Sequence, residues 1–174
     1  IVSCQDLGEC VRSLEPNLAL VVQLRNTAFA DVLRMVMAWA RALQGRTESP
    51  LSLAHTEGEG FDEAAYAQVY CDNPFFSMFH AIARLHLCYL LEQLPQALAA
   101  VLAVRRSAHQ LTGMIWSVLF DFWGSLTLAA NIERAADAAQ RDDWLALMRS
   151  AQASLAVLAR SCAANFRCHS LLLD

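Results

Sequence analysis

The sequence predicts an all-α protein, on three observations. Of its 174 residues 56% are apolar and only 17% are charged, which is enough apolar material for a sizeable core. Only 6 residues are Gly and 4 are Pro, fewer than the frequent turns of a β-sandwich or barrel require. Apolar residues recur at steps of three and four, and strand-like alternation is nearly absent. We therefore expect seven or eight helices.

The N-terminal part predicts two helices that Pro16 separates. A short helix is expected near residues 6–14, followed by a long one over 17–43 with Leu20 and Leu24 on its apolar stripe. Gly45 is a suitable end for the second helix, because glycine readily takes the left-handed conformation of a C-terminal cap.

Residues 46–61 predict the one long loop of the chain, which we interpret as a connection inside one helical domain, with a domain boundary as the alternative. They are rich in Glu, Gly, Ser and Thr, which offer little to bury, so we expect this to be the most mobile internal stretch. The segment from Phe61 to Tyr66 then begins a short helix.

The C-terminal part predicts a series of helices with short connections. Asn73–Pro74 is a strong helix start, and that helix ends near Glu92 because Pro95 begins the next, which ends at Arg105–Arg106. The remaining expected helices cover residues 113–131, 142–158 and a short final segment from 165, and the Ala-rich stretch 133–140 either continues the helix before it or forms a separate one. The apolar run Leu111–Ala130 is interrupted by Asp121, and we interpret it as a core helix and not as a membrane span.

Short connections require neighbouring helices to pack antiparallel. The segment Leu90–Leu98 resembles the turn of a tetratricopeptide repeat, with Glu92 where that turn usually has glycine. We therefore expect antiparallel helix pairs stacked as a short tetratricopeptide-like solenoid, in a single domain over residues 1–174. Because the sequence begins at Ile1 and not at Met, we expect a fragment of a longer protein.

The charged residues argue against several functions. All 13 basic residues are Arg, so the chain has no lysine for a P-loop, a Schiff base or a kinase strand. The net charge of −4 offers no broad basic surface for nucleic acid. The glycines form no nucleotide-binding pattern, and Gly58-Glu59-Gly60 is too acidic to cradle phosphate. No histidine has the sequence context of a phosphoacceptor site.

The histidines and cysteines do not assemble a convincing catalytic or metal site. Neither C-x-x-C nor H-x-x-x-H occurs, and Cys162, Cys168 and His169 lack an evident fourth ligand. His80 and Cys88 share a helix side, but a buried structural thiol explains Cys88 better than a nucleophile does. We therefore expect no catalytic residue, no metal and no cofactor. With no visible secretory signal, the six cysteines predict reduced thiols and a cytoplasmic protein.

Polar residues within apolar helices suggest a ligand-binding groove. Arg84 and Asp121 each lie between bulky apolar neighbours, and an ionised group is costly to bury without a partner. We expect the two to pair between adjacent helices beside Trp116 or Trp123, with His80 also lining the groove. The alternative is a purely structural ion pair or a solvent-facing stripe.

Two short elements carry a family resemblance. Phe61-Asp62-Glu63-Ala64-Ala65-Tyr66 precedes an aromatic-rich helix, and Cys162-Ala163-Ala164-Asn165-Phe166 follows a Trp-containing one. In this order they resemble the helical-repeat region of large bacterial signalling proteins, in which a predictive-ATPase module precedes the repeats and GAF and histidine-kinase modules follow. The family's closing element has Pro-Glu where this chain has Ala163-Ala164. The similarity covers about residues 25–173.

The resemblance implies a non-catalytic sensor or interaction domain that couples an ATPase module to an output module. The alternatives are the effector domain of an ATPase-type transcriptional regulator and, less favoured, a small helical enzyme. The expected partners are other domains of the parent protein or a protein or peptide. A small-molecule effector and a homodimer are also compatible with the sequence.

Overall fold

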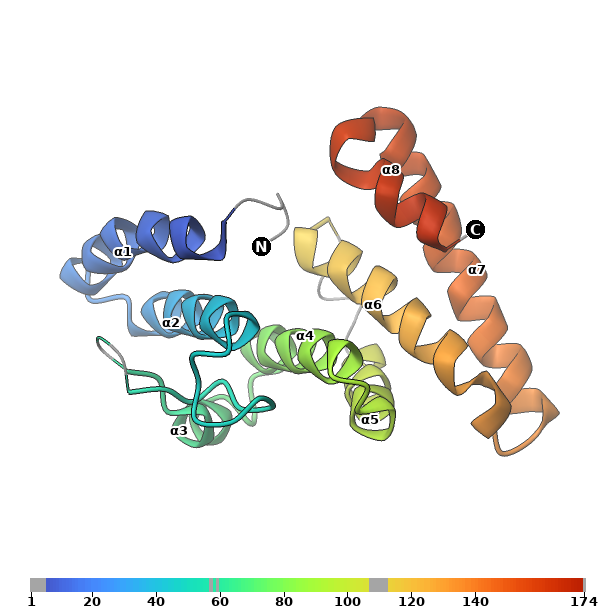
Figure 1. Ribbon diagram of the computed structural model, residues 1–174, viewed down its shortest axis with the longest axis horizontal. Coiled ribbons are helices and arrows are strands. Elements are labelled where there is room, and N and C mark those ends of the chain that lie inside the picture. Colours follow the sequence, from blue (N-terminus) through green and yellow to red (C-terminus); the bar gives the residue numbers. More distant parts are fainter. Residues whose placement is uncertain (1–5, 57, 59, 107–112, 174) are drawn as a thin grey trace. The chain divides into compact units, whose positions relative to one another are not determined.

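The computed structural model describes residues 6–56, 58, 60–106 and 113–173, and its chain divides into two compact units, Ile1–Ala83 and Arg84–Asp174 (Figure 1). The described residues form eight α-helices and a 3₁₀ turn, so the all-α class is confirmed. The stacked solenoid and the single domain over 1–174 stay predictions. The helices are α1 Leu7–Gln23, α2 Thr27–Leu43, α3 Glu63–Val69, α4 Pro74–Leu90, α5 Leu94–Arg105, α6 Ile115–Asn131, α7 Ala138–Ser161 and α8 Ala163–Leu172, with the 3₁₀ turn η2 at Ile132–Arg134.

The sequence predicted that the first helix ends before Pro16. In the structure the helix instead continues through Pro16 to Gln23. A proline inside a helix removes one backbone hydrogen bond and crowds the preceding turn. Helix α1 tolerates this because both of its halves pack on α2: Val11 and Leu18 are buried there with Met37 and Ala40. The predicted boundary was wrong because packing outweighs this local penalty.

The chain reverses at Arg25, where the sequence predicted an uninterrupted helix over 17–43. Arg25 has φ 54°, and the N–H of Asn26 bonds to the carbonyl of Val21, which together close a left-handed cap. The side chain of Asn26 then accepts from the N–H of Phe29 and caps the start of α2. This reversal makes α1 and α2 an antiparallel hairpin in unit 1 (Figure 1).

Helix α2 is the centre of the unit 1 core. Met35, Ala38 and Ala40 are fully buried, and Trp39 is nearly so. Burial around most of a helix requires covering elements on several sides. Helix α1 supplies one of them, and α3 with the preceding loop lies on another side (Figure 1).

The described part of the 46–61 loop buries several side chains, contrary to the expectation that this stretch has little to bury. Leu53 is fully buried, His55 is 5% exposed and Phe61 is 8% exposed. His55 and Phe61 also exchange two backbone hydrogen bonds, N to O, of 3.2 and 2.8 Å. Gly60 has φ +69°, and a Cβ there would lie 3.2 Å from the carbonyl oxygen of His55. Glycine is therefore required at this bridge.

The turn between α4 and α5 closes with a left-handed helix cap. Glu92 has φ 58°, the left-handed conformation that glycine favours. The N–H of Gln93 bonds to the carbonyl of Cys88 at 2.8 Å, and the N–H of Glu92 bonds to that of Tyr89 at 3.1 Å. These two bonds form a Schellman cap, so Glu92 occupies a glycine position in structure as well as in sequence.

Replacing Glu92 by glycine should stabilise the protein. A non-glycine residue in the left-handed region costs about 1–2 kcal/mol, of which the greater freedom of glycine in the unfolded chain cancels part. We expect the free energy of unfolding to rise by about 0.5–1 kcal/mol in urea denaturation. Gln93→Gly is the matched control, because φ of Gln93 is −84° and glycine relieves no strain there. Stabilisation by both substitutions, or by neither, would contradict this explanation.

Unit 2 is built from α5 to α8, each packed against the next, with the last turns of α4 (Figure 1). Arg105 of α5 reaches Asp143 of α7 with two hydrogen bonds of 2.5 and 2.8 Å, and this lowers the pKa of Asp143. The stretch Ile115–Arg134 has the length and mean hydropathy, 1.2, of a membrane-crossing helix. Core helices of soluble proteins meet the same criterion, so it is weak support for a span.

Helix α7 begins earlier than the sequence predicted. Asp137 accepts from the N–H of Gln140 at 2.8 Å and caps a single helix that passes through Asp142 and Asp143 to Ser161. The expected separate helix over 133–140 is replaced by the 3₁₀ turn η2 and the first turn of α7. An aspartate is a good cap, and of the three candidates in this stretch only Asp137 has the extended backbone that capping requires.

Candidate functional site

The five residues of the predicted groove do not all lie in one unit. Arg84, near the end of α4, belongs to unit 2, as do Trp116, Asp121 and Trp123 of α6. All four are half-buried. His80 belongs to unit 1, where its Nε2 lies 2.7 Å from Oε1 of Glu63 and its ring contacts Tyr66.

The predicted ion pair between Arg84 and Asp121 is not observed among the described residues. Among the described residues, no ion pair or hydrogen bond joins these two side chains, and burial alone raises the pKa of Asp121 to about 6. The premise was that a buried carboxylate needs a cation. A partly buried carboxyl can instead relieve its desolvation by binding a proton more tightly.

Trp123 contacts two residues that the groove prediction omitted. The ring of His86 stacks on Trp123 with centroids 4.0 Å apart and an interplanar angle of 24°, and Tyr89 contacts the same indole at 5.6 Å. Burial lowers the pKa of His86 to about 4, so the imidazole is neutral at pH 7. The sequence contained the signal, since His86 lies on the apolar stripe of its helix. In this cluster His86 is buried, while Tyr89 and Trp123 are half-buried.

Asp121 makes the stability of the protein depend on pH. Its folded pKa, about 6, lies above the ordinary 3.8, so the folded state binds the proton more tightly. The stabilising contribution of the protonated carboxyl is full below about pH 4 and is lost as the pH rises through 6. Asp121→Asn should therefore raise the free energy of unfolding at pH 7 by roughly 1–3 kcal/mol and change it little at pH 4.

The measurement for Asp121→Asn is urea denaturation of both proteins at several pH values between 4 and 7.5. His86 contributes in the opposite sense, because its lowered pKa removes stability as the pH falls from 6.5 toward 4. The difference between the variant and the native chain cancels that contribution. A difference that does not change with pH would show that Asp121 has an ordinary pKa.

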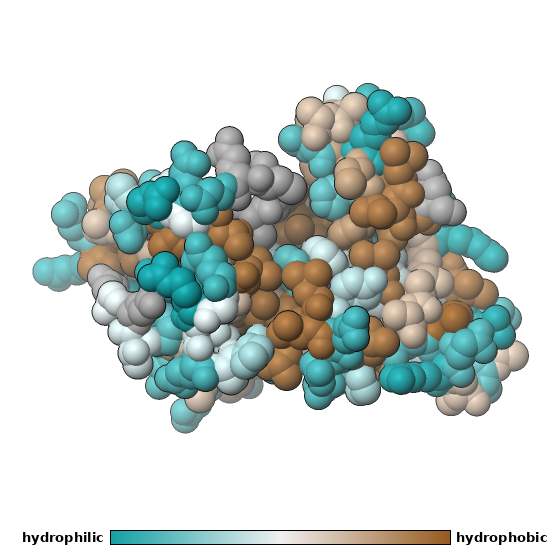
Figure 2. Space-filling view, viewed as in Figure 1, coloured by the Kyte–Doolittle hydropathy of each residue, from teal (hydrophilic) through white to brown (hydrophobic). Residues whose placement is uncertain are grey.

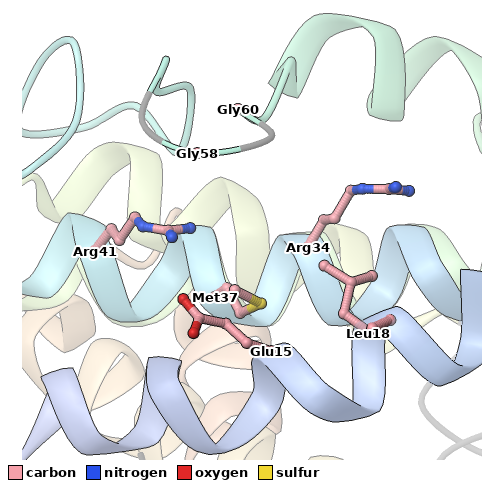
Figure 3. A pocket seen from close by; sticks show the side chains of 8 residues that line it. Glu15, Leu18, Arg34, Met37, Arg41, Gly58 and Gly60 are labelled. Carbon is pink, nitrogen blue, oxygen red and sulfur yellow. The ribbon is translucent and has the colours of Figure 1, made fainter.

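A pocket that described residues line lies in unit 1, between α1, α2 and the loop. It has a volume of about 260 Å³. Its lining combines two guanidinium groups, one carboxylate and an apolar floor, and Figure 3 shows most of these side chains (Glu15, Leu18, Ala19, Arg34, Met37, Arg41, Gly58 and Gly60). Glu15 and Arg41 lie at one end, Leu18 and Arg34 at the other, and Met37 lies between them.

The spacing of residues on α2 produces this arrangement. Arg34, Met37 and Arg41 are three and seven positions apart, so they lie along one face over two helical turns, about 10 Å. Arg34 donates to Asp31 at 3.1 Å, and Asp31 also accepts from the hydroxyl of Tyr70 at 2.8 Å. Burial, together with that bond, raises the pKa of Tyr70 to about 12.

Arg41 is oriented by the loop. Its Nη1 lies 3.3 Å from Nε2 of the buried His55, and this contact joins the guanidinium to the loop. Gly58, with φ +63°, lines the same end of the pocket. Described residues of the loop thus contribute to one wall of the site, and the mobility expected for this stretch stays a prediction.

A second pocket, about 200 Å³, lies in unit 2 between α6, α7 and the end of α8. Its lining is mainly apolar, with Arg149 and Gln152 from α7. In the described ranges, no three His, Cys, Asp or Glu side chains group as metal ligands would. Cys71, Cys162 and Cys168 are exposed thiols.

Comparisons with known proteins add no assignment. No protein-family model matches the chain, and neither the curated proteins nor the solved structures give a significant match. The interpretation therefore depends on the chemistry of the unit 1 pocket.

Proposed function

We propose that this chain is a non-catalytic helical sensor and interaction domain of a multidomain bacterial signalling protein, coupling an ATPase module to an output module in the cytoplasm. The observation that carries the proposal is the composition of the unit 1 pocket. It presents Arg34, Arg41 and Glu15 over an apolar floor, which are groups that recognise a ligand. Its described lining includes no cysteine, serine or histidine to serve as a nucleophile or base.

The first of the two elements behind the family resemblance supports the proposal, because its residues have structural roles. Phe61 is buried, and Asp62 caps α3 by accepting from the N–H of Ala65. Glu63 accepts from the N–H of Leu53, and the hydroxyl of Tyr66 donates to the carbonyl of Phe76. The glycine-like backbone of Glu92 supports the likeness to a repeat turn. A motif whose residues have these structural roles supports the resemblance better than sequence similarity alone does.

Exposed apolar side chains support contact with other domains or a protein partner. Leu20, Leu24 and Phe29 in unit 1 are 54–69% exposed, and Leu171 and Leu172 of α8 are 60–61% exposed. Apolar side chains reach the surface at several places among hydrophilic ones (Figure 2). Such exposure is common where a surface is covered in an assembly.

The direct test is the reading frame that encodes the chain. The proposal expects an ATPase module upstream and a GAF or histidine-kinase module downstream. A DNA-binding module in place of the kinase would instead assign the chain to a transcriptional regulator. A frame that encodes this chain alone, or flanks without an ATPase, would contradict the coupling role.

A biochemical test complements the reading frame. The purified chain should neither hydrolyse ATP nor autophosphorylate, because it has no lysine and no glycine-rich phosphate loop. An ATP dissociation constant in the micromolar range, measured by calorimetry, would overturn the non-catalytic assignment.

A further inference from the structure

We propose that the unit 1 pocket binds a small zwitterion with an apolar body, an apolar α-amino acid such as leucine. The carboxylate of the ligand contacts Arg41, its ammonium group contacts Glu15, and its side chain lies on Leu18 and Met37. The inference rests on the proposed sensor function, because it names what the domain senses.

The carboxylate position follows from Arg41. This guanidinium donates to a histidine, and no carboxylate among the described residues lies within ion-pair distance of it. A guanidinium has five N–H donors, so the bond to His55 leaves others for a ligand. The contact with His55 orients the planar guanidinium, and its remaining N–H groups are suited to a bidentate contact with a carboxylate.

The ammonium position follows from Glu15. This side chain lies on α1 at the same end of the pocket as Arg41 (Figure 3), yet within the described part of the chain no ion pair joins the two. Two opposite charges that face one cavity without meeting suit a ligand whose two opposite charges are on groups bonded to the same carbon. An α-amino acid has this property, whereas a simple acid or amine satisfies only one of the two.

The Arg34 end of the pocket argues against a ligand with two carboxylates. Arg34 already has the carboxylate of Asp31 at 3.1 Å, so this guanidinium is already engaged by an acidic group. The surface between the two ends is formed by Leu18, Ala19 and Met37. An apolar side chain therefore matches this region better than a second carboxylate.

The volume limits the ligand to a small molecule. A pocket of about 260 Å³ lies below the range of about 300–1,000 Å³ that holds drug-sized ligands. A single amino acid is compatible with this space, and a folded peptide segment is not.

The test is isothermal titration calorimetry of the 174-residue chain with three probes. L-leucine should bind with a dissociation constant below about 1 mM. 4-Methylpentanoate lacks the amine, and 3-methylbutylamine lacks the carboxylate, and each should bind at least tenfold more weakly. The absence of leucine binding up to about 10 mM, or equal binding of leucine and 4-methylpentanoate, would overturn the inference.

Variants separate the two charged contacts. Glu15→Gln should weaken leucine binding about tenfold and leave 4-methylpentanoate unchanged, so that the two probes bind alike. Arg41→Gln should weaken both of these probes by a similar factor. Glu9→Gln and Arg12→Gln are matched controls, because both residues are exposed on α1 outside the pocket and should leave leucine affinity unchanged.

The outcomes separate this inference from the proposed function. Glu15 is exposed, so Glu15→Gln should fold normally and remains informative even if Arg41→Gln disturbs the loop through His55. If leucine fails to bind while the gene encodes a flanking ATPase, the ligand inference is wrong and the sensor role stands. If leucine binds with the expected dependence on Glu15 but the flanks lack an ATPase, the site stands and the coupling role is wrong.

Discussion

Replacing Glu63 by alanine is expected to lower the free energy of unfolding by about 3 kcal/mol. The Glu63 carboxylate accepts from the N–H of Leu53 at 2.8 Å and the hydroxyl of Ser52 at 3.3 Å, and its other oxygen lies 2.7 Å from the His80 ring. Hydrogen bonds to a charged group contribute about 1.5–3 kcal/mol, and the N–H of fully buried Leu53 would lose its acceptor. One side chain thus links the loop, α3 and α4.

Urea denaturation followed by circular dichroism measures this effect. Glu63→Gln keeps an acceptor oxygen and should cost clearly less than alanine. Glu133→Ala is the control, because that side chain is 84% exposed and its nearest cation is 3.8 Å away, so a change within about 0.5 kcal/mol is expected. Equal effects at Glu63 and Glu133 would show that the loop does not depend on this carboxylate.

Leu53→Ala is expected to destabilise the protein by about 3 kcal/mol, although it lies in a loop. Leu53 is fully buried, and truncating a buried leucine removes transfer free energy and leaves a cavity, at about 2–5 kcal/mol in total. The same variant should make the loop more sensitive to limited proteolysis, because the buried anchor holds its middle.

The control for Leu53 is Leu24→Ala, at a leucine that is 69% exposed. It should change the free energy of unfolding by less than about 0.5 kcal/mol. A loss below about 1 kcal/mol for Leu53→Ala would restore the original expectation of a loosely held loop.

The helices themselves were largely predictable, because their signals are local. Asn73 and Pro74 marked the start of α4, and Pro95 marked the second residue of α5. The errors arose where two local signals compete. Pro16 suggested a helix end, but burial of Val11 and Leu18 on either side keeps α1 intact.

The candidate site was less predictable, because it depends on how helices are paired. Arg34, Met37 and Arg41 form a visible stripe on α2, but only the reversal at Arg25 places Glu15 opposite them. The sequence did not reveal this reversal, because apolar residues recur at helical spacing on both sides of it. Other contacts depend on the rotation of one helix against another, which periodicity does not specify.

Hydrogen–deuterium exchange of the 174-residue chain, with and without saturating L-leucine, tests the central claim of a ligand-sensing pocket most directly. Binding between α1, α2 and the loop should slow exchange in peptides that contain Leu18, Met37 or Gly58. Glu15→Gln, at the same leucine concentration, should show much less protection. Unchanged exchange of the native chain at these segments, or protection confined to α6 and α7, would contradict the account.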